Sequence, residues 1–323
     1  MRSTGPSVSE KRIDALPKIK REGEETAMSE FLSANLPYLL SGISVGGQYA
    51  LIAIGYTMVY GILRLINFAH GDIFMMAGFF MVYISASCSL AVSIPLVLLL
   101  TVILGVVIER AAYKPLRTAP RMSVMISAIG VSYLLQNLAN YITGGIARAY
   151  PDIPFFTQVM NVGGLNIKRI TIITPILTIA LVVVLVILIQ KTKVGMAMRA
   201  VSRDFETSQL MGIKINSVIS MTFVIGSFLA GVASILYFAN YGQVSPMIGA
   251  MPGLKAFVAA VFGGIGSIPG AVIGAFIIGI CESFIKANET IAVFSNAFTF
   301  ALLIVILLCK PNGLFGEKLT EKV

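Results

Sequence analysis

The stretch KTKVGMAMRAVSRDFETSQLMGIKIN, residues 191–216, is a basic, polar segment between two long apolar runs. A helix over about residues 198–211 would be amphipathic, because 3.6 residues per turn separate its apolar side chains from its charged ones. The segment is therefore predicted to form a short helix outside the apolar runs. Its apolar face would hold Met198, Val201 and Phe205, and its charged face Arg199, Arg203 and Glu206.

Both ends of such a helix have recognisable signals. Asp204 can cap a helix start, which would put Glu206 in the first turn, near the positive end of the helix dipole. Gly212 can adopt the left-handed conformation that ends a helix. Any loop on the cytoplasmic side of a membrane protein tends to be basic and weakly helical, so the pattern alone leaves the role of this segment open.

The composition assigns the chain to the membrane. Of its 323 residues, 57% are hydrophobic and only 12% are charged, whereas about 25% of the residues in soluble domains are charged. The mean hydropathy is +0.88. We therefore expect an all-α, polytopic membrane protein. The net charge of +9 comes from Lys and Arg in short loops between apolar runs, which indicates orientation in a membrane and not nucleic-acid binding.

Several apolar runs are long enough to cross a bilayer, which takes about 17–25 residues. Two further stretches are apolar but interrupted: residues 66–85 open with NFAHGD, and residues 254–280 contain GGIGSIPG. Non-helical backbone at membrane depth is tolerated where it packs on protein or lines a cavity, so we expect broken or re-entrant helices there. The uninterrupted runs are residues 36–63, 90–108, 123–142, 170–189, 218–241 and 291–308.

The basic clusters give a way to count crossings, since Lys and Arg gather on the cytoplasmic side. The clusters lie in the N-terminal tail, in residues 110–121 and 191–214, and after residue 310. If both interrupted stretches turn back, all of these clusters face the cytoplasm. We therefore predict that both are re-entrant, and full crossing remains the alternative.

The cluster Asn67, His70 and Asp72 is the densest polar group in the apolar part of the first half of the chain. Polar side chains at membrane depth are costly unless they face a cavity or partners, which makes them candidates for a translocation path. Capping and loop architecture is the favoured interpretation, because turns need Asn and Asp and Gly71 permits tight backbone in either case. His70 is the only histidine and could also act as a proton relay.

Glycines in the second interrupted stretch allow two interpretations. Gly266, Gly270 and Gly274 repeat at the four-residue spacing that lets membrane helices approach closely, and helix packing is the favoured interpretation. In the alternative, the break at Gly263, Gly264 and Gly266 lines the translocation path with exposed backbone groups. The positive N-termini of half-helices there would attract the carboxylate of a small zwitterion.

The motifs that are absent from the sequence restrict its chemistry. It contains no G-x-x-x-x-G-K-[ST] phosphate loop, no HExxH and no GxSxG, so we expect neither ATP hydrolysis nor peptide hydrolysis by this chain. Cys88, Cys281 and Cys309 lack the spacing of a metal site, and we expect no metal or cofactor. Any ATP energy would have to come from a separate subunit, and residues 191–216 are where it could enter.

Two stretches carry a resemblance to a known family. GMAMRAVSRDFETSQLMGI, residues 195–213, is similar to the cytoplasmic loop of ATP-binding-cassette permeases of the branched-chain amino acid type, in which a short helix docks on an ATPase subunit. GGQYALIAIGYTMVYGILRLINFAHGD, residues 46–72, resembles the N-terminal signature of the leucine/isoleucine/valine permease. Where such permeases commonly have an alanine pair before the loop glycine, this chain has Thr207 and Ser208.

The resemblance implies an organisation for the chain. It covers residues 28–315, which would be the transmembrane permease domain with a coupling loop at 190–216. Residues 316–323 would be a cytoplasmic tail. Residues 1–27 are polar and lack apolar periodicity, so we expect a disordered N-terminal extension, and we hypothesise that it is dispensable or a misassigned start.

The resemblance also implies function and partners. The chain would be one permease of an importer in the bacterial inner membrane, with a second related permease, two ATPase subunits and an extracytoplasmic binding protein that delivers leucine, isoleucine or valine. The coupling loop and the C-terminus would be cytoplasmic. Arg199, Arg203 and Glu206 are the expected polar contacts with the ATPase, Leu210 and Met211 the apolar anchor, and Gly212 the helix end.

Two other functions stay open at this stage. Related permeases of the same architecture carry urea or short amides, and nothing in the sequence excludes that cargo. The chain could instead be an autonomous channel or ion-coupled transporter that uses His70 and Asp72. The scarcity of intramembrane carboxylates disfavours that alternative.

Overall fold

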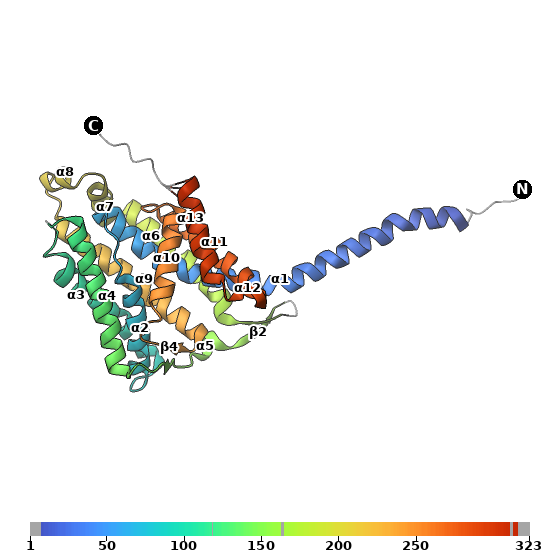
Figure 1. Ribbon diagram of the computed structural model, residues 1–323, viewed down its shortest axis with the longest axis horizontal. Coiled ribbons are helices and arrows are strands. Elements are labelled where there is room, and N and C mark those ends of the chain that lie inside the picture. Colours follow the sequence, from blue (N-terminus) through green and yellow to red (C-terminus); the bar gives the residue numbers. More distant parts are fainter. Residues whose placement is uncertain (1–7, 118, 163–164, 311–312, 316–323) are drawn as a thin grey trace, which may run out of the picture.

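The computed structural model describes residues 8–117, 119–162, 165–310 and 313–315, although the side chains of residues 8–34 and 162 lie outside the described part. The described chain is almost entirely helical (Figure 1). The helices are α1 (Val8–Leu63), α2 (His70–Ser85), α3 (Leu90–Ile108), the π-helix η1 (Glu109–Tyr113), α4 (Arg121–Thr143), α5 (Pro154–Thr157), α6 (Arg169–Lys191), α7 (Lys193–Arg203), α8 (Phe205–Leu210), α9 (Ile215–Tyr241), α10 (Ala250–Gly263), α11 (Ile268–Ala287), α12 (Glu289–Ala292) and α13 (Ser295–Cys309).

Four short strands form two separate antiparallel pairs. β1 (Arg148–Ala149) pairs with β4 (Gln243–Val244), and β2 (Val159–Val162) pairs with β3 (Leu165–Lys168). The first pair joins residues that are about a hundred positions apart in the chain. It therefore ties the connection after α4 to the connection after α9.

Six described helices are long and apolar enough to cross a membrane, which confirms the predicted all-α polytopic class. Five of them coincide with predicted runs, and the sixth is α11 instead of residues 291–308. In that last run the shorter helix α13 has only 15 residues. The segment of α1 from Asn35 and α9 lie centrally and are largely buried, whereas α4 and α6 lie at the periphery.

The helices run between two faces of the molecule. α6 ends one residue before α7, and α9 begins after α8, so one face carries α7 and α8 and is named here the α7–α8 face. α9 ends next to β4, so the other face carries the paired strands and is named the strand face. Figure 1 shows α7 and α8 at one end of the helical body, and α5, β2 and β4 at the other.

The prediction that residues 66–85 turn back is wrong, because this stretch crosses from one face to the other. Arg64, just after α1, donates a hydrogen bond from its guanidinium to the Ser202 carbonyl of α7 (3.3 Å), which places the end of α1 at the α7–α8 face. After α2, α3 and η1 return the chain to that same face, where Arg117 contacts Asn216. α2 therefore ends at the strand face, and the Asn35 end of α1 lies there too.

The second interrupted stretch is also not re-entrant, because it forms the end of one helix and most of another. α10 runs from near β4 to the α7–α8 face, where the turn after it places Gly266 beside Gly61 near the end of α1. α11 then returns to the strand face. The helices α10 and α11 thus make two crossings. Lys214 and Lys310 therefore lie on the same face, as predicted, but through two full crossings and not through a re-entrant turn.

The contacts between helices follow an inverted repeat, in which α1 to α4 correspond to α9, α10, α11 and α13. α1 packs on α11 as α9 packs on α3, and α10 packs on α1 as α2 packs on α9. The pairs α2 with α4 and α10 with α13 correspond in the same way. Inverted repeats whose short helices meet inside the membrane are a common construction of transport proteins.

The two short helices of the repeat, α2 and α10, cross at their N-terminal turns. A Cβ atom added at Gly71 would lie 2.7 Å from the carbonyl oxygen of Gly249 and 3.1 Å from the Cα of Gly253. This approach is possible only without side chains on these residues, so backbone packs directly on backbone. Gly42 and Gly46, which have the four-residue spacing of small residues in membrane helix packing, make a similar contact with α11.

The N-terminal extension stays a prediction. The backbone of α1 begins at Val8, inside the segment that we expected to be disordered, but the side chains before Asn35 lie outside the described residues. Residues 316–323, expected to form a cytoplasmic tail, also lie outside the described part.

We predict that Gly71→Ala lowers the free energy of unfolding by about 1–3 kcal/mol, because the added methyl group overlaps the backbone of α10. Gly130→Ala in α4 is the matched control, since nothing lies within 4 Å of a Cβ at that position, and alanine should be neutral or stabilising there. The thermal unfolding midpoints of the two purified variants test this. Equal midpoints would contradict the packing described here.

Candidate functional site

The predicted amphipathic segment is two helices and not one. α7 ends at Arg203, and Asp204 has an extended conformation (φ −150°, ψ 111°) before α8 begins at Phe205. Asp204 caps α8, as expected, by accepting a hydrogen bond from the Thr207 N–H (3.0 Å). A residue that caps a new helix cannot continue the previous one, because the cap requires non-helical backbone.

The break at Asp204 separates the residues predicted for the apolar face. Met198 and Val201 of α7 are buried, as expected, whereas Phe205 of α8 is 42% exposed. Gly212 has φ +80° and ends the segment in the left-handed conformation that was predicted for it.

The residues proposed for contact with an ATPase all lie on the surface of the segment. Leu210 and Met211, at the tip, are 87% and 78% exposed. The described chain leaves these two side chains without an apolar surface of its own to cover them. The exposed residues of the proposed coupling set are Arg199, Arg203, Glu206, Leu210, Met211 and Gly212.

The base of the segment, in contrast, is held tightly. Thr192 caps α7 by accepting a hydrogen bond from the Gly195 N–H (3.1 Å). Gly195 packs against the backbone of Ile189 so closely that a side chain would not fit, which fixes a sharp bend between α6 and α7. Arg64 adds the bond to Ser202. A movement of α7 therefore acts directly on α1 and α6.

The polar cluster at the start of α2 is buried, and only some of its polar atoms have hydrogen-bond partners in the described structure. Asn67 accepts a hydrogen bond from the Tyr113 hydroxyl (2.7 Å), and Asp72 accepts one from the Gln136 amide of α4 (3.0 Å). The capping role considered for Asp72 is wrong, because Ala69 is the N-cap residue and Asp72 lies in the first turn. Near the positive end of the helix dipole, a carboxylate is still favourable.

His70 fills a gap between the central helices. Its ring lies against Gly55 of α1 and Gly226 of α9 and meets the Tyr56 ring edge-on, with centroids 5.0 Å apart. The ring also forms a hydrogen bond with the backbone of Ile52. These contacts favour packing over a proton relay.

The glycine break after α10 is a tight turn between helices. Gly264 and Gly266 have positive φ (106° and 100°), and Gly263 lies against the backbone of Gly270. The carbonyl oxygen of Gly263 accepts a hydrogen bond from the Phe315 N–H (3.0 Å). Gly270 and Gly274 thus pack on the backbone of α10, as the helix-packing interpretation predicted, whereas Gly266 lies in the turn with nothing within 4 Å of a Cβ there.

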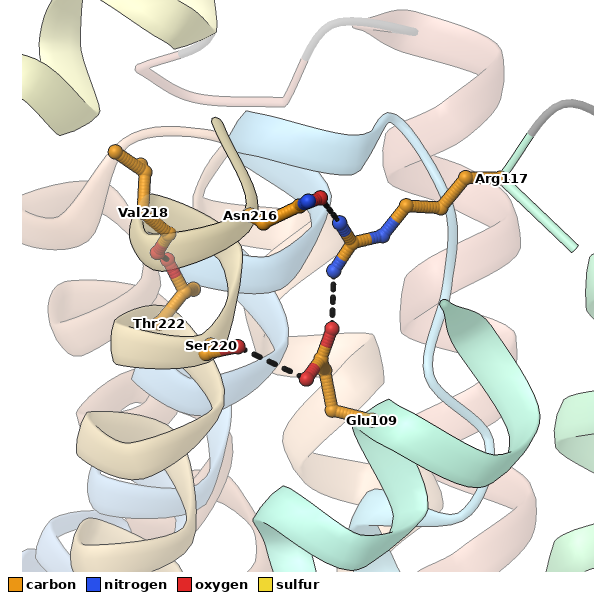
Figure 2. Close-up of polar contacts among 6 residues, drawn as sticks. All are labelled: Glu109, Arg117, Asn216, Val218, Ser220 and Thr222. Carbon is orange, nitrogen blue, oxygen red and sulfur yellow. Dashed lines mark hydrogen bonds and ion pairs between the residues drawn. The ribbon is translucent and has the colours of Figure 1, made fainter. Parts of the chain in front are cut away.

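Glu109 and Arg110 follow an apolar run and, from the sequence alone, fit ordinary charges at a membrane interface, but the structure shows that Glu109 is a buried carboxylate. Glu109 is fully buried in η1 and forms an ion pair with Arg117, which also contacts the Asn216 side chain at the start of α9. Ser220 donates a second hydrogen bond to Glu109 (2.9 Å). Figure 2 shows this chain of contacts, which joins η1 to α9.

A second buried carboxylate, Glu282 of α11, has two cationic partners. Lys255 of α10 is 2.7 Å away and Lys286, one turn along α11, is 2.6 Å away. The Tyr49 hydroxyl of α1 donates a third contact (3.0 Å). The pair with Lys286 has the i,i+4 spacing that can be read from a sequence, but the pair with Lys255 does not. A single lysine in an apolar run is the signal that could have found it, because such a charge needs a partner.

Together, these observations define a class of protein. The chain is a polytopic membrane protein built on an inverted repeat, with two half-helices that meet inside the body and an exposed helical segment on one face. This combination is typical of the membrane-spanning part of a transport protein.

Comparison with known proteins identifies the family. Residues 38–307 match the family described as "Branched-chain amino acid transport system / permease component". The chain therefore belongs to this family of membrane permeases.

Several relatives support the assignment. The high-affinity branched-chain amino acid transport system permease protein BraD of Pseudomonas aeruginosa is 39% identical over 302 residues, which cover 89% of this chain and 98% of the relative. The corresponding permease protein LivH of Escherichia coli K12 is 39% identical over 312 residues, 92% of this chain and all of the relative. A probable permease protein LivH of Methanocaldococcus jannaschii is 27% identical over 287 residues. The relatives are named as transport permeases and not as enzymes.

We predict that Glu282→Gln destabilises the protein, because it leaves buried Lys255 without a countercharge. Loss of one partner of a buried pair costs about 3–5 kcal/mol. Lys286→Gln should cost much less, since Lys286 is 45% exposed and its removal leaves the Lys255–Glu282 pair intact. Unfolding midpoints in detergent measure both effects, and a larger loss in Lys286→Gln would show that the pair is not the stabilising contact.

Proposed function

We propose that this chain is a membrane-spanning subunit of an ATP-driven importer of branched-chain amino acids. The observation that carries the proposal is the α7–α8 segment, which is exposed at its tip and held at its base by α1, α6 and α9. Such a segment can pass the movement of a bound partner into the spans, because packed helices shift as units. The cargo, leucine, isoleucine or valine, is inferred from the family and from the names of the relatives.

The other components follow from what the chain lacks. Its sequence has no phosphate loop for ATP, so the energy would come from two ATPase subunits that bind the α7–α8 segment. Leu210 and Met211 would enter an apolar groove of the ATPase, with Arg199, Arg203 and Glu206 as polar contacts around them. A second related permease and an extracytoplasmic binding protein would complete the importer.

The distribution of basic residues supports an orientation in the bacterial inner membrane. Arg110, Arg121, Lys193 and Lys214 all belong to the α7–α8 face, and positive residues gather on the cytoplasmic side. In the proposed orientation the α7–α8 segment and the C-terminus are cytoplasmic. The strand face would then receive cargo from the binding protein.

The candidate path residues divide into two groups. Asn67, His70, Gly71 and Asp72 lie at the start of α2, next to its crossing with α10, and we propose that the path passes this crossing. The positive N-terminal ends of both half-helices meet there and would favour the carboxylate of an amino acid. Residues 263–266 lie at the α7–α8 face, where they would border the inner end of the path.

The proposal is tested by reconstitution. The chain is purified with its candidate ATPases and permease partner, placed in vesicles, and supplied with ATP, labelled leucine and the binding protein. Uptake that requires every component is the expected result. Uptake by this chain alone along a gradient would favour a channel, and uptake of urea in place of leucine would correct the cargo.

We predict that Glu206→Lys uncouples ATP hydrolysis from uptake, because it reverses a charge on the exposed surface of α8. Leucine uptake should fall at least about tenfold, which corresponds to the loss of about 1.4 kcal/mol of coupling, while the complex still hydrolyses ATP. Glu289→Lys makes the same charge change on the strand face, and it should leave the leucine transported per ATP hydrolysed unchanged. An equal fall of this ratio in the two variants would contradict the placement of the coupling site.

A further inference from the structure

A cavity of about 380 Å³ lies at the α7–α8 face and is not explained by cargo transport. Its walls come from three regions: the end of α1, the region from η1 to the start of α4, and the junction of α7 and α8. The volume is in the range of small-molecule sites in proteins. Four arginines contribute to the lining, namely Arg64, Arg117, Arg121 and Arg203.

The cavity carries a strong positive charge. Of these four arginines, only Arg117 forms an ion pair with a described carboxylate, that of Glu109, as Figure 2 shows. Arg64 donates to a backbone carbonyl, which leaves its charge uncompensated. The described part of the chain offers no ion-pair partner to Arg121 or Arg203. Like charges placed around one cavity repel each other, so an anion between them would be stabilising.

One donor group of the arginines that line the cavity also lacks an acceptor. The Nε of Arg117 is buried and has no hydrogen-bond partner in the described structure. A buried donor without an acceptor is costly, by about 1–3 kcal/mol. Arg64 has a positive φ (54°), a strained conformation for a residue other than glycine, and its guanidinium is held at the cavity wall by Ser202. The site thus combines one unpaired buried donor with three arginines that have no carboxylate partner in the described chain.

The position of the cavity identifies its ligand. It lies where α1 ends and α4 begins, between the apolar spans and the polar α7–α8 segment. The ends of membrane spans meet the lipid head groups, so we infer that the cavity lies at that depth. Ile62, Leu65 and Val124 line it beside the arginines, so the wall is part apolar and part cationic. Guanidinium groups bind phosphate oxygens through paired hydrogen bonds. We propose that this arginine cavity binds the phosphate group of an anionic phospholipid.

A bound phosphate would join the ends of three elements, of which α1 and α7 are already linked by the Arg64–Ser202 hydrogen bond. Arg64 follows α1, Arg121 starts α4 and Arg203 ends α7. The lipid would therefore strengthen the connection between the spans and the α7–α8 segment. This consequence for transport rests on the proposed function, whereas the binding itself does not.

The experiment measures binding to the purified full chain in a zwitterionic detergent. Dihexanoylphosphatidylglycerol, dihexanoylphosphatidylcholine and inorganic phosphate are titrated separately, and the shift of the unfolding midpoint gives each apparent Kd. We expect the anionic lipid to bind at least tenfold more tightly than the zwitterionic one. Tight binding of inorganic phosphate alone would identify a free anion as the ligand and overturn the assignment to lipid.

Arg121→Gln is the decisive variant, since no described contact depends on its guanidinium. It should weaken binding of the anionic lipid about fivefold. The double variant, Arg121→Gln with Arg203→Gln, should weaken binding about 25-fold, because each arginine contributes a factor of about five. Arg110→Gln is the matched control, because Arg110 is exposed on the same face but does not line the cavity.

Two results would overturn the proposal. One is equal affinity of the wild-type chain for the two lipids, a comparison that needs no variant to fold. The other is equal weakening by Arg110→Gln and Arg121→Gln, which would mean that only the overall charge of the face attracts the lipid. If the wild-type chain binds no lipid but Arg121→Gln prevents assembly with the ATPases, the cavity instead receives an acidic side chain of that partner.

Discussion

The contact of Gly71 with Gly249 and Gly253 is the constraint on which the rest of the structure depends. It lets the first turns of α2 and α10 cross backbone to backbone inside the helical body. Both helices start at this crossing. The chain that leads to each helix from its own face is therefore non-helical, and each helix has only part of the length of a normal membrane span. The inverted repeat is built around this crossing, with α1 and α9 beside it.

Each buried carboxylate inside the helical body lies beside specific partner groups. Glu109 and Glu282 are both buried, and each is held by a cation and a hydroxyl group from other elements. A carboxylate in this environment must be compensated, since its transfer from water to an apolar region is costly. The first group ties η1 to α9 near the α7–α8 face, and the second ties α1, α10 and α11 together. Neither group resembles a catalytic pair.

The sequence predicted what depends on local pattern. Apolar length located five of the six long helices, and the cap at Asp204 and the end at Gly212 were read correctly from residue type. The direction of residues 66–85 was predicted wrongly, because the positive-inside rule was applied to an N-terminal tail that joins α1 at the strand face. Counting positive charges predicts the side of the membrane on which short loops lie. It is less informative when a half-helix makes one of the crossings.

Long-range pairings were beyond the reach of such patterns. The counterpart of the break NFAHGD is the stretch before α10, residues 242–249, and not the glycine-rich turn after it. That turn drew attention because of its composition, whereas its true role is to reverse the chain. Lys255 with Glu282 and Arg117 with Glu109 likewise pair residues on different elements, so only the packed structure brings them together.

The central claim is that the exposed tip of the α7–α8 segment is where the ATPase binds. Photo-crosslinking tests this contact, with p-benzoylphenylalanine placed at position 210 or, as the control, at position 293. Leu210 and Val293 are 87% and 83% exposed and lie at opposite ends of the molecule. In an assembled, transport-active complex, the account predicts a crosslink to the ATPase from position 210 and none from position 293. A crosslink to the ATPase from position 293 only would contradict it.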